Sequence, residues 1–420
     1  MIFSSLDLAP DIQKALDACG YSQMTPIQET AIVPARRGKN ILASAQTGTG
    51  KTAAFAVPIL QQMYDSPKAI VPGNSRALIL TPTRELAEQV AESIKRYAQF
   101  LPISVTALYG GVKMSAQQKK LKAGVDIIVS TPGRLMEHME QGNIKLSNVE
   151  FVVLDEADRM LDMGFIADVH SLLQKTLKKR QTLLFSATMS QPIKELANKL
   201  LFSHEVISVA RQNAIAETVE HVLYQVEERL KDELFVELLD EQNWFKVLVF
   251  TSTKDQADKL MRRLKPAKIE VAICHGDKSQ GSRRRAIADF KSGKIQVLIA
   301  TEVAARGLDI KGLDYVVNYN LPYLAEDYVH RVGRTGRAGA SGLAISFVSR
   351  EEERSLSNIE HVIGSKIKRI KKEGYGEGSR EKILKNIEDH SRPKRANKVS
   401  QTRIIRNKVN KKKAAKKRNG

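Results

Sequence analysis

The chain has 420 residues, a length typical of two or three domains, and 42% of them are hydrophobic, which is enough to build buried cores. Its net charge of +20 and its isoelectric point near 9.7 indicate a polyanionic partner, either a nucleic acid or an anionic membrane surface. The two cysteines, Cys19 and Cys274, argue against a disulfide framework or a cysteine-rich metal site, and no run of about 18 apolar residues predicts a membrane-spanning helix.

Residues 1–7 lack the basic start and long apolar run of a signal peptide, so we expect a cytoplasmic protein. Short, continuous apolar runs then recur along two stretches of the chain. Such runs predict strands buried on both faces, as in a parallel sheet. The first series lies at 40–43, 77–80, 126–129, 150–154 and 182–185, and the second at 247–250, 271–273, 297–299, 315–317 and 343–347. Helix-compatible segments between them, such as 85–100 and 193–201, predict an α/β fold.

The two series predict two α/β domains, residues 1–207 and 219–365, joined by a linker at 208–218, where polar residues and alanine replace the apolar runs. Residues 366–420 form a Lys-rich tail that we expect to be disordered, because its composition cannot bury a core. From Gly364 to Gly420 there are 21 Lys/Arg and 5 Asp/Glu, so most of the excess charge sits there. The tail is expected to bind a polyanion; a solubility role and a membrane-surface role are the alternatives.

The strongest local motif is AQTGTGKT, from Ala45 to Thr52, between an apolar run and a helix-compatible segment. This is the context of a phosphate-binding loop, whose glycines let backbone N–H groups approach the phosphates and whose following helix adds a favourable dipole. Lys51 is expected to reach the β and γ phosphates, and Thr52 to hold Mg²⁺. Ala45 departs from the general pattern, which has glycine there. A chance Gly/Thr-rich turn is the alternative.

An acidic motif, Asp155-Glu156-Ala157-Asp158, directly follows the apolar run 151–154. Acidic residues at the carboxyl end of a buried strand handle Mg²⁺ and the attacking water in ATPases of this kind. We expect Asp155 to bind the metal, partly through water, and Glu156 to polarise the water that attacks the γ phosphate. An ordinary acidic helix start is the alternative.

A third motif, HRVGRTGR at residues 330–337, places two arginines three residues apart between glycines. Arg334 and Arg337 are candidate arginine fingers, which stabilise transition-state charge in related enzymes. A basic surface turn or a contact to a nucleic-acid backbone is the alternative. If these arginines complete the phosphate site, the site forms only when the two domains close, which makes hydrolysis conditional on conformation.

In their order along residues 1–350, these motifs resemble those of DEAD-box RNA helicases of superfamily 2. Residues 20–28 look like the Q motif of that family, with Phe3 as its upstream aromatic, and Ala45 is the family's own form of the loop. The resemblance implies two tandem RecA-like domains, each a parallel sheet flanked by helices, with ATP and Mg²⁺ as cofactors. The implied nucleotide-binding residues are Phe3, Tyr21, Gln28, Ala45, Gln46, Thr47, Gly48, Thr49, Gly50, Lys51, Thr52, Gly307 and Asp309. The implied catalytic residues are Lys51, Asp155, Glu156, Ser186, Thr188, His330, Arg334 and Arg337.

The resemblance also implies an RNA site divided between the two domains and built largely from small and hydroxyl residues. Its expected members are Pro82, Thr83, Arg84, Gly110, Gly111, Thr131, Pro132, Gly133, Arg134, Thr253, His275, Gly276, Gln280, Arg283, Thr301 and Arg306. One departure is Glu302, where the family usually has Asp. The segment Arg159–Phe165 and the short N-terminus look most like the bacterial RhlE-type branch.

The implied function is RNA-stimulated ATP hydrolysis coupled to local, non-processive unwinding or remodelling of RNA and ribonucleoproteins. Contacts of the core are expected with phosphates and not with bases, so that RNA is bound without sequence preference. Ribosomal precursors and RNA-decay machinery are the candidate partners, and the core is expected to be monomeric. Two alternatives stay open: a DNA helicase or translocase of the same superfamily, and an ATP-gated RNA clamp or assembly scaffold with little unwinding.

Overall fold

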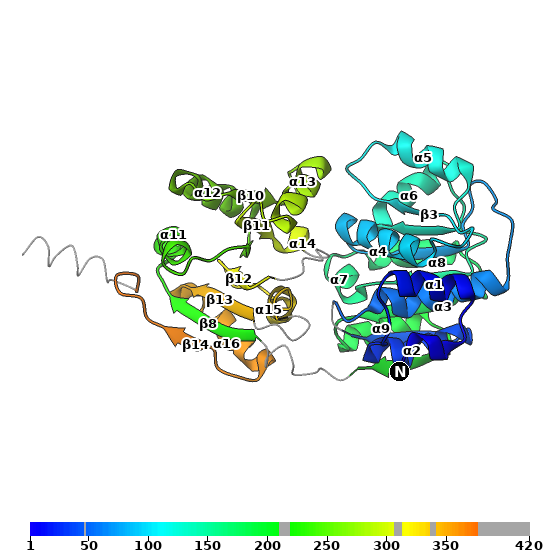
Figure 1. Ribbon diagram of the computed structural model, residues 1–420, viewed down its shortest axis with the longest axis horizontal. Helices are drawn as coiled ribbons and strands as arrows, with labels where there is room; N and C mark the ends of the chain where they lie inside the picture. Colours follow the sequence, from blue (N-terminus) through cyan, green and yellow to red (C-terminus); the bar gives the residue numbers. More distant parts are fainter. Residues whose placement is uncertain (46–47, 210–218, 306–312, 337–341, 377–420) are drawn as a thin grey trace, which may run out of the picture.

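A computed structural model describes residues 1–45, 48–209, 219–305, 313–336 and 342–376. Within these residues the chain forms two lobes, each built on a parallel sheet of seven strands flanked by helices (Figure 1). The predicted α/β class is therefore confirmed.

The first lobe has the strand order β3-β4-β2-β5-β6-β1-β7. Its strands are β1 (Asn40–Ser44), β2 (Ala77–Leu80), β3 (Val105–Leu108), β4 (Ile127–Ser130), β5 (Phe151–Leu154), β6 (Gln181–Ser186) and β7 (His204–Ser208). Its helices are α1 (Pro10–Ala18), α2 (Pro26–Arg36), α3 (Lys51–Asp65), α4 (Arg84–Tyr97), α5 (Met114–Ala123), α6 (Pro132–Glu140), α7 (Ala157–Asp162), α8 (Ile166–Gln174) and α9 (Gln191–Leu200).

The second lobe has the strand order β10-β11-β9-β12-β13-β8-β14. Its strands are β8 (Val219–Gln225), β9 (Val247–Thr251), β10 (Val271–Cys274), β11 (Val297–Thr301), β12 (Tyr315–Asn318), β13 (Gly342–Val348) and β14 (Lys368–Ile370). Its helices are α11 (Lys231–Glu241), α12 (Lys254–Leu264), α13 (Gln280–Lys291), α14 (Glu302–Ala305), α15 (Ala325–Val332) and α16 (Glu353–Ile363), with short 3-10 turns at Glu228–Leu230 and Arg350–Glu352. Numbered from the first strand of each lobe, the two orders are identical.

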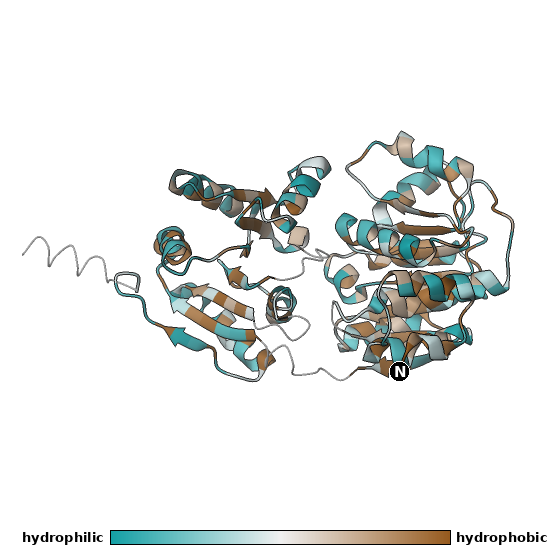
Figure 2. Cartoon of the chain, viewed as in Figure 1, coloured by the Kyte–Doolittle hydropathy of each residue, from teal (hydrophilic) through white to brown (hydrophobic). Residues whose placement is uncertain are grey.

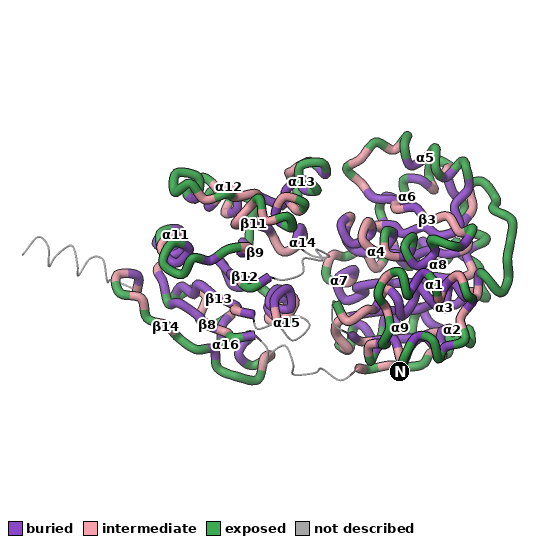
Figure 3. The backbone as a smooth tube through the Cα atoms, in the orientation of Figure 1, coloured by how far each residue is buried: buried purple, intermediate pink, exposed green. Residues whose placement is uncertain are grey.

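The central strands are continuous apolar runs because helices cover both faces of each sheet. In β5, Phe151 and Val153 face one apolar cluster, while Val152 and Leu154 face the other. Figure 2 shows the hydrophobic residues concentrated on the strands, and Figure 3 shows the same strands buried. This packing fixes the carboxyl ends of the strands, where the sequence motifs lie.

Four strands carry too few consecutive apolar residues to be recognised as buried runs: β3, β7, β8 and β14. Three of them, β3, β7 and β14, lie at the edge of a sheet. Every residue of β7 is exposed or half-buried, and Val206 is among the exposed ones. An edge strand faces solvent along one side, so its sequence can stay polar. The predicted linker at 208–218 begins inside β7, and residues 210–218 lie outside the described part of the chain.

The second lobe extends past the expected boundary at residue 365. Strand β14 pairs with β8 through Arg369 opposite Leu223, and the ring of Tyr375 is buried in the core of the lobe. Lys372 pairs with Glu237 at 2.8 Å on α11. Residues 366–376 thus belong to the second lobe by structure, and residues 377–420 lie outside the described part. No helix in the described residues has the length and apolarity needed to cross a membrane.

Candidate active site and RNA interface

Three sequence motifs meet at one edge of the first sheet. Strands β5, β6 and β1 are neighbours in the sheet, and all of them run parallel. Because the carboxyl ends of parallel strands lie at the same edge, the phosphate loop after β1, the acidic motif after β5 and residues 186–188 after β6 come together.

The phosphate loop has the backbone that its glycines permit. Gly48 and Gly50 have φ angles of 84° and 90°, in the left-handed region that favours glycine. A Cβ added to Gly50 would lie 2.3 Å from Nε2 of Gln28, so a larger residue there would displace the Gln28 amide. Helix α3 begins at Lys51, immediately after this turn. Gln46 and Thr47 lie outside the described residues.

Lys51 and Asp155 are buried polar groups of opposite charge at this edge, with 6% and 3% of their surface exposed. Nζ of Lys51 and Oδ1 of Asp155 make no hydrogen bond to any described residue. The pKa of Asp155 is raised to about 6, chiefly by burial. The charge of Lys51 opposes this increase, and the charge of Glu156 adds to it. A buried ammonium without a partner fits a phosphate, and a buried carboxylate with one unpartnered oxygen fits a hydrated Mg²⁺. Thr52, the first residue after Lys51, is half-buried beside them.

The acidic motif is held against residues 186–188. Asp158 accepts hydrogen bonds from the backbone N–H groups of Ala187 and Thr188 at 3.0 and 3.1 Å. Oγ of Ser186 also accepts from the Thr188 N–H, at 3.2 Å. Glu156 has φ 56° and ψ 52°, a left-handed conformation that is uncommon for glutamate and occurs preferentially at functional sites.

The Q-motif residues surround the phosphate loop from the other side. The side chain of Gln28 accepts from the Thr25 N–H at 2.9 Å and donates to the Gly50 carbonyl at 3.1 Å. Phe3 has no exposed surface and stacks on Tyr21, with ring centroids 5.8 Å apart. Phe3 therefore supports Tyr21, and its own ring has no accessible face in this conformation.

The second lobe contacts the first beside these carboxylates. Arg159 of α7 forms ion pairs with Asp162 at 2.8 Å and with Asp327 of α15. Burial lowers the pKa of Arg159, but Asp327, Glu302 and Asp162 outweigh it and raise the value overall. His330 lies 3.4 Å from the Arg159 guanidinium, and burial lowers its pKa, against the charges of Asp158 and Glu156. A neutral His330 at this position can exchange a hydrogen bond without adding a charge to the site.

Arg331 and Arg334 are both buried at the end of α15. Arg331 donates to Glu302 and, at 2.7 Å, to the carbonyl of Asn320. Oε1 of Glu302 also lies 4.0 Å from the Arg159 guanidinium, so the longer side chain at this position has partners in both lobes. Arg306, Gly307, Asp309 and Arg337 lie outside the described residues.

The predicted RNA residues of the first lobe lie around the carboxyl ends of β2, β3 and β4. Thr83 is buried and caps α4 by accepting from the Leu86 N–H at 3.3 Å. Arg84 lies across Gly111, where an added Cβ would be 2.0 Å from its guanidinium. Arg134 donates to the Val112 carbonyl at 3.3 Å. The exposed or half-buried members of this set are Arg84, Gly110, Gly111, Thr131 and Gly133, while Pro82 and Pro132 are buried.

In the second lobe the predicted RNA residues divide into two groups. Thr253 and Gly276 are exposed, Thr301 is half-buried, and His275 is buried with Nε2 3.3 Å from Asp258. Arg283 and Gln280 instead contact Glu85 of the first lobe, at 2.7 and 3.2 Å. These two residues therefore lie in a contact between the lobes.

Sequence reasoning missed this second meeting point of the lobes, which joins Glu85 and Glu88 of α4 to Arg283 and Arg284 of α13. It also gave no role to Asp158, Arg159 or Asp327. The sequence shows only that these residues carry opposite charges. It does not show which arginine pairs with which carboxylate, because the fold has to bring the two together.

Fold and site together define an ATPase with two α/β lobes whose catalytic edge is completed by the second lobe. The DEAD/DEAH box helicase family model matches residues 25–196, and the model described as helicase conserved C-terminal domain matches residues 230–339. The DEAD-box ATP-dependent RNA helicase CshA of Bacillus subtilis is 41% identical over 370 residues, covering 88% of this chain and 74% of CshA. The ATP-dependent RNA helicase RhlB of Pseudomonas syringae is 40% identical and covers 87% of this chain and 93% of RhlB.

Solved structures agree with the fold. Saccharomyces cerevisiae Dbp5 bound to RNA and ADP-BeF3 superposes with a TM-score of 0.79 at 32% identity, over 92% of this chain and 99% of that one. Mss116p bound to single-stranded RNA and AMP-PNP gives a TM-score of 0.80 at 27% identity, over 92% and 82% of the two chains. The chain belongs to the DEAD-box family of ATP-dependent RNA helicases, with tandem RecA-like lobes, ATP and Mg²⁺ as cofactors and RNA as partner. Membership of the RhlE-type branch stays a prediction, because these bacterial relatives carry the names CshA and RhlB.

Proposed function

We propose that this chain uses one composite ATP site to drive local, non-processive remodelling of RNA. Lys51 and the N–H groups of the loop bind the β and γ phosphates, and Gln28 and Tyr21 form the adenine side of the site, with Phe3 supporting the Tyr21 ring from behind. Asp155 and Thr52 hold Mg²⁺, which neutralises phosphate charge when it is bound. Glu156 accepts a proton from the attacking water, and its left-handed backbone conformation at the start of α7 is of a kind that occurs preferentially at functional sites.

The observation that carries this proposal is the contact of Arg159 with Asp327 and His330, next to Glu156. It brings α15, and with it Arg334, to the carboxylates of the first lobe only when the lobes meet. We propose that Arg334, together with Arg337, stabilises the charge that develops on the γ phosphate. Thr188, whose N–H donates to both Asp158 and Ser186, would transmit the state of the acidic motif to the RNA side together with Ser186.

The RNA strand is proposed to cross both lobes along the accessible backbone at Gly110, Gly111, Gly133, Thr253 and Gly276. Small residues let N–H groups approach phosphate oxygens, so the strand is positioned without its bases being read. Because Arg283 and Gln280 contact Glu85 of the first lobe, we propose that these two residues stabilise the closed arrangement of the lobes. RNA then favours closure because the two halves of its site align only in the closed arrangement.

Steady-state ATP hydrolysis with and without single-stranded RNA tests this function, with DNA as the control and Glu156→Gln as the inactive reference. Stimulation by RNA but not DNA, lost in the variant, is expected. Equal stimulation by DNA would favour the translocase alternative. Release of a labelled strand from a short duplex in a single ATP cycle separates remodelling from the clamp alternative, which predicts retention of both strands.

The tail is proposed to tether the two-lobed core to structured RNA such as ribosomal precursors, or to RNA undergoing decay, in the cytoplasm. Its excess of Lys and Arg supports this proposal, since each phosphate neutralised on a single strand contributes about −0.7 to the slope of log affinity against log salt. A tail truncation has to begin after residue 376 and not after residue 365, because β14 and Tyr375 belong to the second lobe.

A further inference from the structure

The second lobe contains a structural counterpart of the phosphate loop. Because the two sheets have the same strand order, β8 corresponds to β1, and the loop after β8 corresponds to the loop that precedes α3. Helix α3 begins at Lys51, and helix α11 begins at Lys231. A lysine therefore opens the corresponding helix in both lobes.

The surroundings of the two lysines differ in one respect. Lys231 has no exposed side-chain surface and forms ion pairs with Glu228 and Glu352, both at 2.6 Å. Nζ of Lys51, in contrast, makes no hydrogen bond to any described residue. In the second lobe, internal carboxylates thus stand where the first lobe leaves a place for phosphate.

These carboxylates lead directly to the segment before α15. Oε1 of Glu352 accepts from the Leu321 N–H at 2.9 Å, while its other oxygen holds Lys231. The side chain of Asn320 donates to Glu228 at 3.4 Å, and its carbonyl accepts from Arg331 at 2.7 Å. Only four residues separate Asn320 from the start of α15, so this anchor fixes the point from which that helix departs.

We infer that Lys231, through Glu352 and Glu228, is a positioning residue for the arginines of the composite ATP site. The two carboxylates, Glu228 and Glu352, occupy the place that a phosphate would take beside the lysine. They hold residues 320–324 in position and thereby also position Arg331 and Arg334. This assignment rests on the proposed role of Arg334 in hydrolysis. The loop after β8 would then contribute to catalysis although the second lobe binds no nucleotide there.

The test is RNA-stimulated ATP hydrolysis by Lys231→Met in the full-length chain, measured well below its melting temperature. The expected result is a fall in kcat of about 10- to 100-fold with little change in the KM for ATP, since displacing a catalytic group by about 1 Å has that size of effect. Lys231→Arg, which keeps the charge, should recover most of the activity. Lys291→Met, at the exposed last residue of α13, is the matched control and should retain full activity.

Glu352→Gln provides a second measurement if Lys231→Met does not fold, because the amide keeps an acceptor for the Leu321 N–H and removes only the charge. A normal kcat in a folded Lys231→Met or Glu352→Gln protein overturns the inference. A decrease in activity that is fully explained by a smaller fraction of folded protein overturns it as well. Arg334→Ala separates this failure from that of the proposed function. If Arg334→Ala is inactive while the folded Lys231 variant is fully active, only the positioning role is wrong; if Arg334→Ala is active, the arginine's assigned role is wrong as well.

Discussion

Asp155 is expected to destabilise the ligand-free first lobe, so that Asp155→Asn should raise its stability while abolishing activity. Burial raises the pKa of this carboxyl from 3.8 to about 6, which means that the folded state disfavours the charged form at neutral pH. A shift of about two units corresponds to about 3 kcal/mol, and the asparagine variant avoids this cost because it is neutral. For a lobe of this size, 3 kcal/mol is about 6–12 °C in melting temperature.

The sign of the pH dependence follows from the direction of the shift. The folded state binds the proton more tightly than the unfolded state, so the cost is fully present above pH 6 and decreases as the pH falls toward 3.8. The gain from Asp155→Asn should therefore shrink to about half at pH 5 and nearly vanish near pH 4.

The measurement is thermal unfolding of the wild type and Asp155→Asn in EDTA without nucleotide, at pH 7.5 and pH 5. Asp17→Asn, an exposed aspartate in the same lobe, is the matched control and should change little at either pH. An Asp155→Asn protein that melts at or below the wild-type temperature at pH 7.5, or a difference that does not change with pH, would refute this account of the site.

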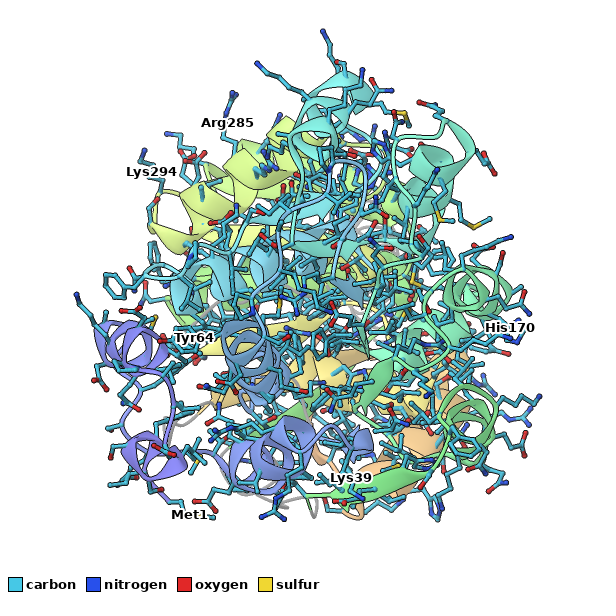
Figure 4. All side chains as sticks on the ribbon, turned by 90° about the vertical axis from the view of Figure 1, so that its right-hand side faces the viewer. Met1, Lys39, Tyr64, His170, Arg285 and Lys294 are labelled. Atoms are coloured by element: carbon cyan, nitrogen blue, oxygen red, sulfur yellow. The ribbon has the colours of Figure 1, made fainter. Side chains whose placement is uncertain are left out.

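Three further outcomes are expected. Glu156→Gln should lower kcat by at least about 10²-fold while binding of a fluorescent ATP analogue persists, because only the general base is removed; loss of binding instead would contradict that role. Arg283→Ala should reduce RNA-induced closure, followed by energy transfer between labelled lobes, whereas Arg285→Ala on the same helix, whose side chain points outward in Figure 4, should not. Truncation after residue 376 should leave the melting temperature unchanged. It should reduce the slope of log RNA affinity against log salt by about 0.7 for each phosphate that the tail neutralises in the full-length chain. Truncation after residue 365 should also lower the melting temperature, and equal melting temperatures for both truncations would show that β14 adds no stability.

Much of the edge of the first sheet that carries the motifs could be predicted, because its residues directly follow strands that can be recognised from their apolar sequence. The run before Asp155 is apolar throughout and the run before Ala45 has an apolar centre, and parallel pairing of β1, β6 and β5 then leaves little choice about where the motifs meet. The structure brings Lys51 and Asp155 to one edge of the first sheet, and their roles with phosphate and Mg²⁺ stay predictions.

The contacts between the lobes could not be predicted, since they depend on the relative placement of elements far apart in the chain. Arg283 was expected to contact RNA, and nothing in its local sequence distinguishes an anion on RNA from the carboxylate of Glu85, which it contacts. Glu302 was noted only as a departure from the family's Asp, and its pairing with Arg331 becomes visible only in the fold. Strands β7 and β14 were missed because edge strands need no apolar run.

The identical strand order of the two sheets points to a duplicated unit whose copies have divided their tasks. The sequence GKT occurs once in the chain, and the lysine at the corresponding place in the second copy is already neutralised by Glu228 and Glu352. For a chain built in this way we expect a stoichiometry of one nucleotide per molecule. We therefore expect its dependence on ATP concentration at saturating RNA to be hyperbolic, with a Hill coefficient of about one, because cooperativity requires at least two sites that influence each other.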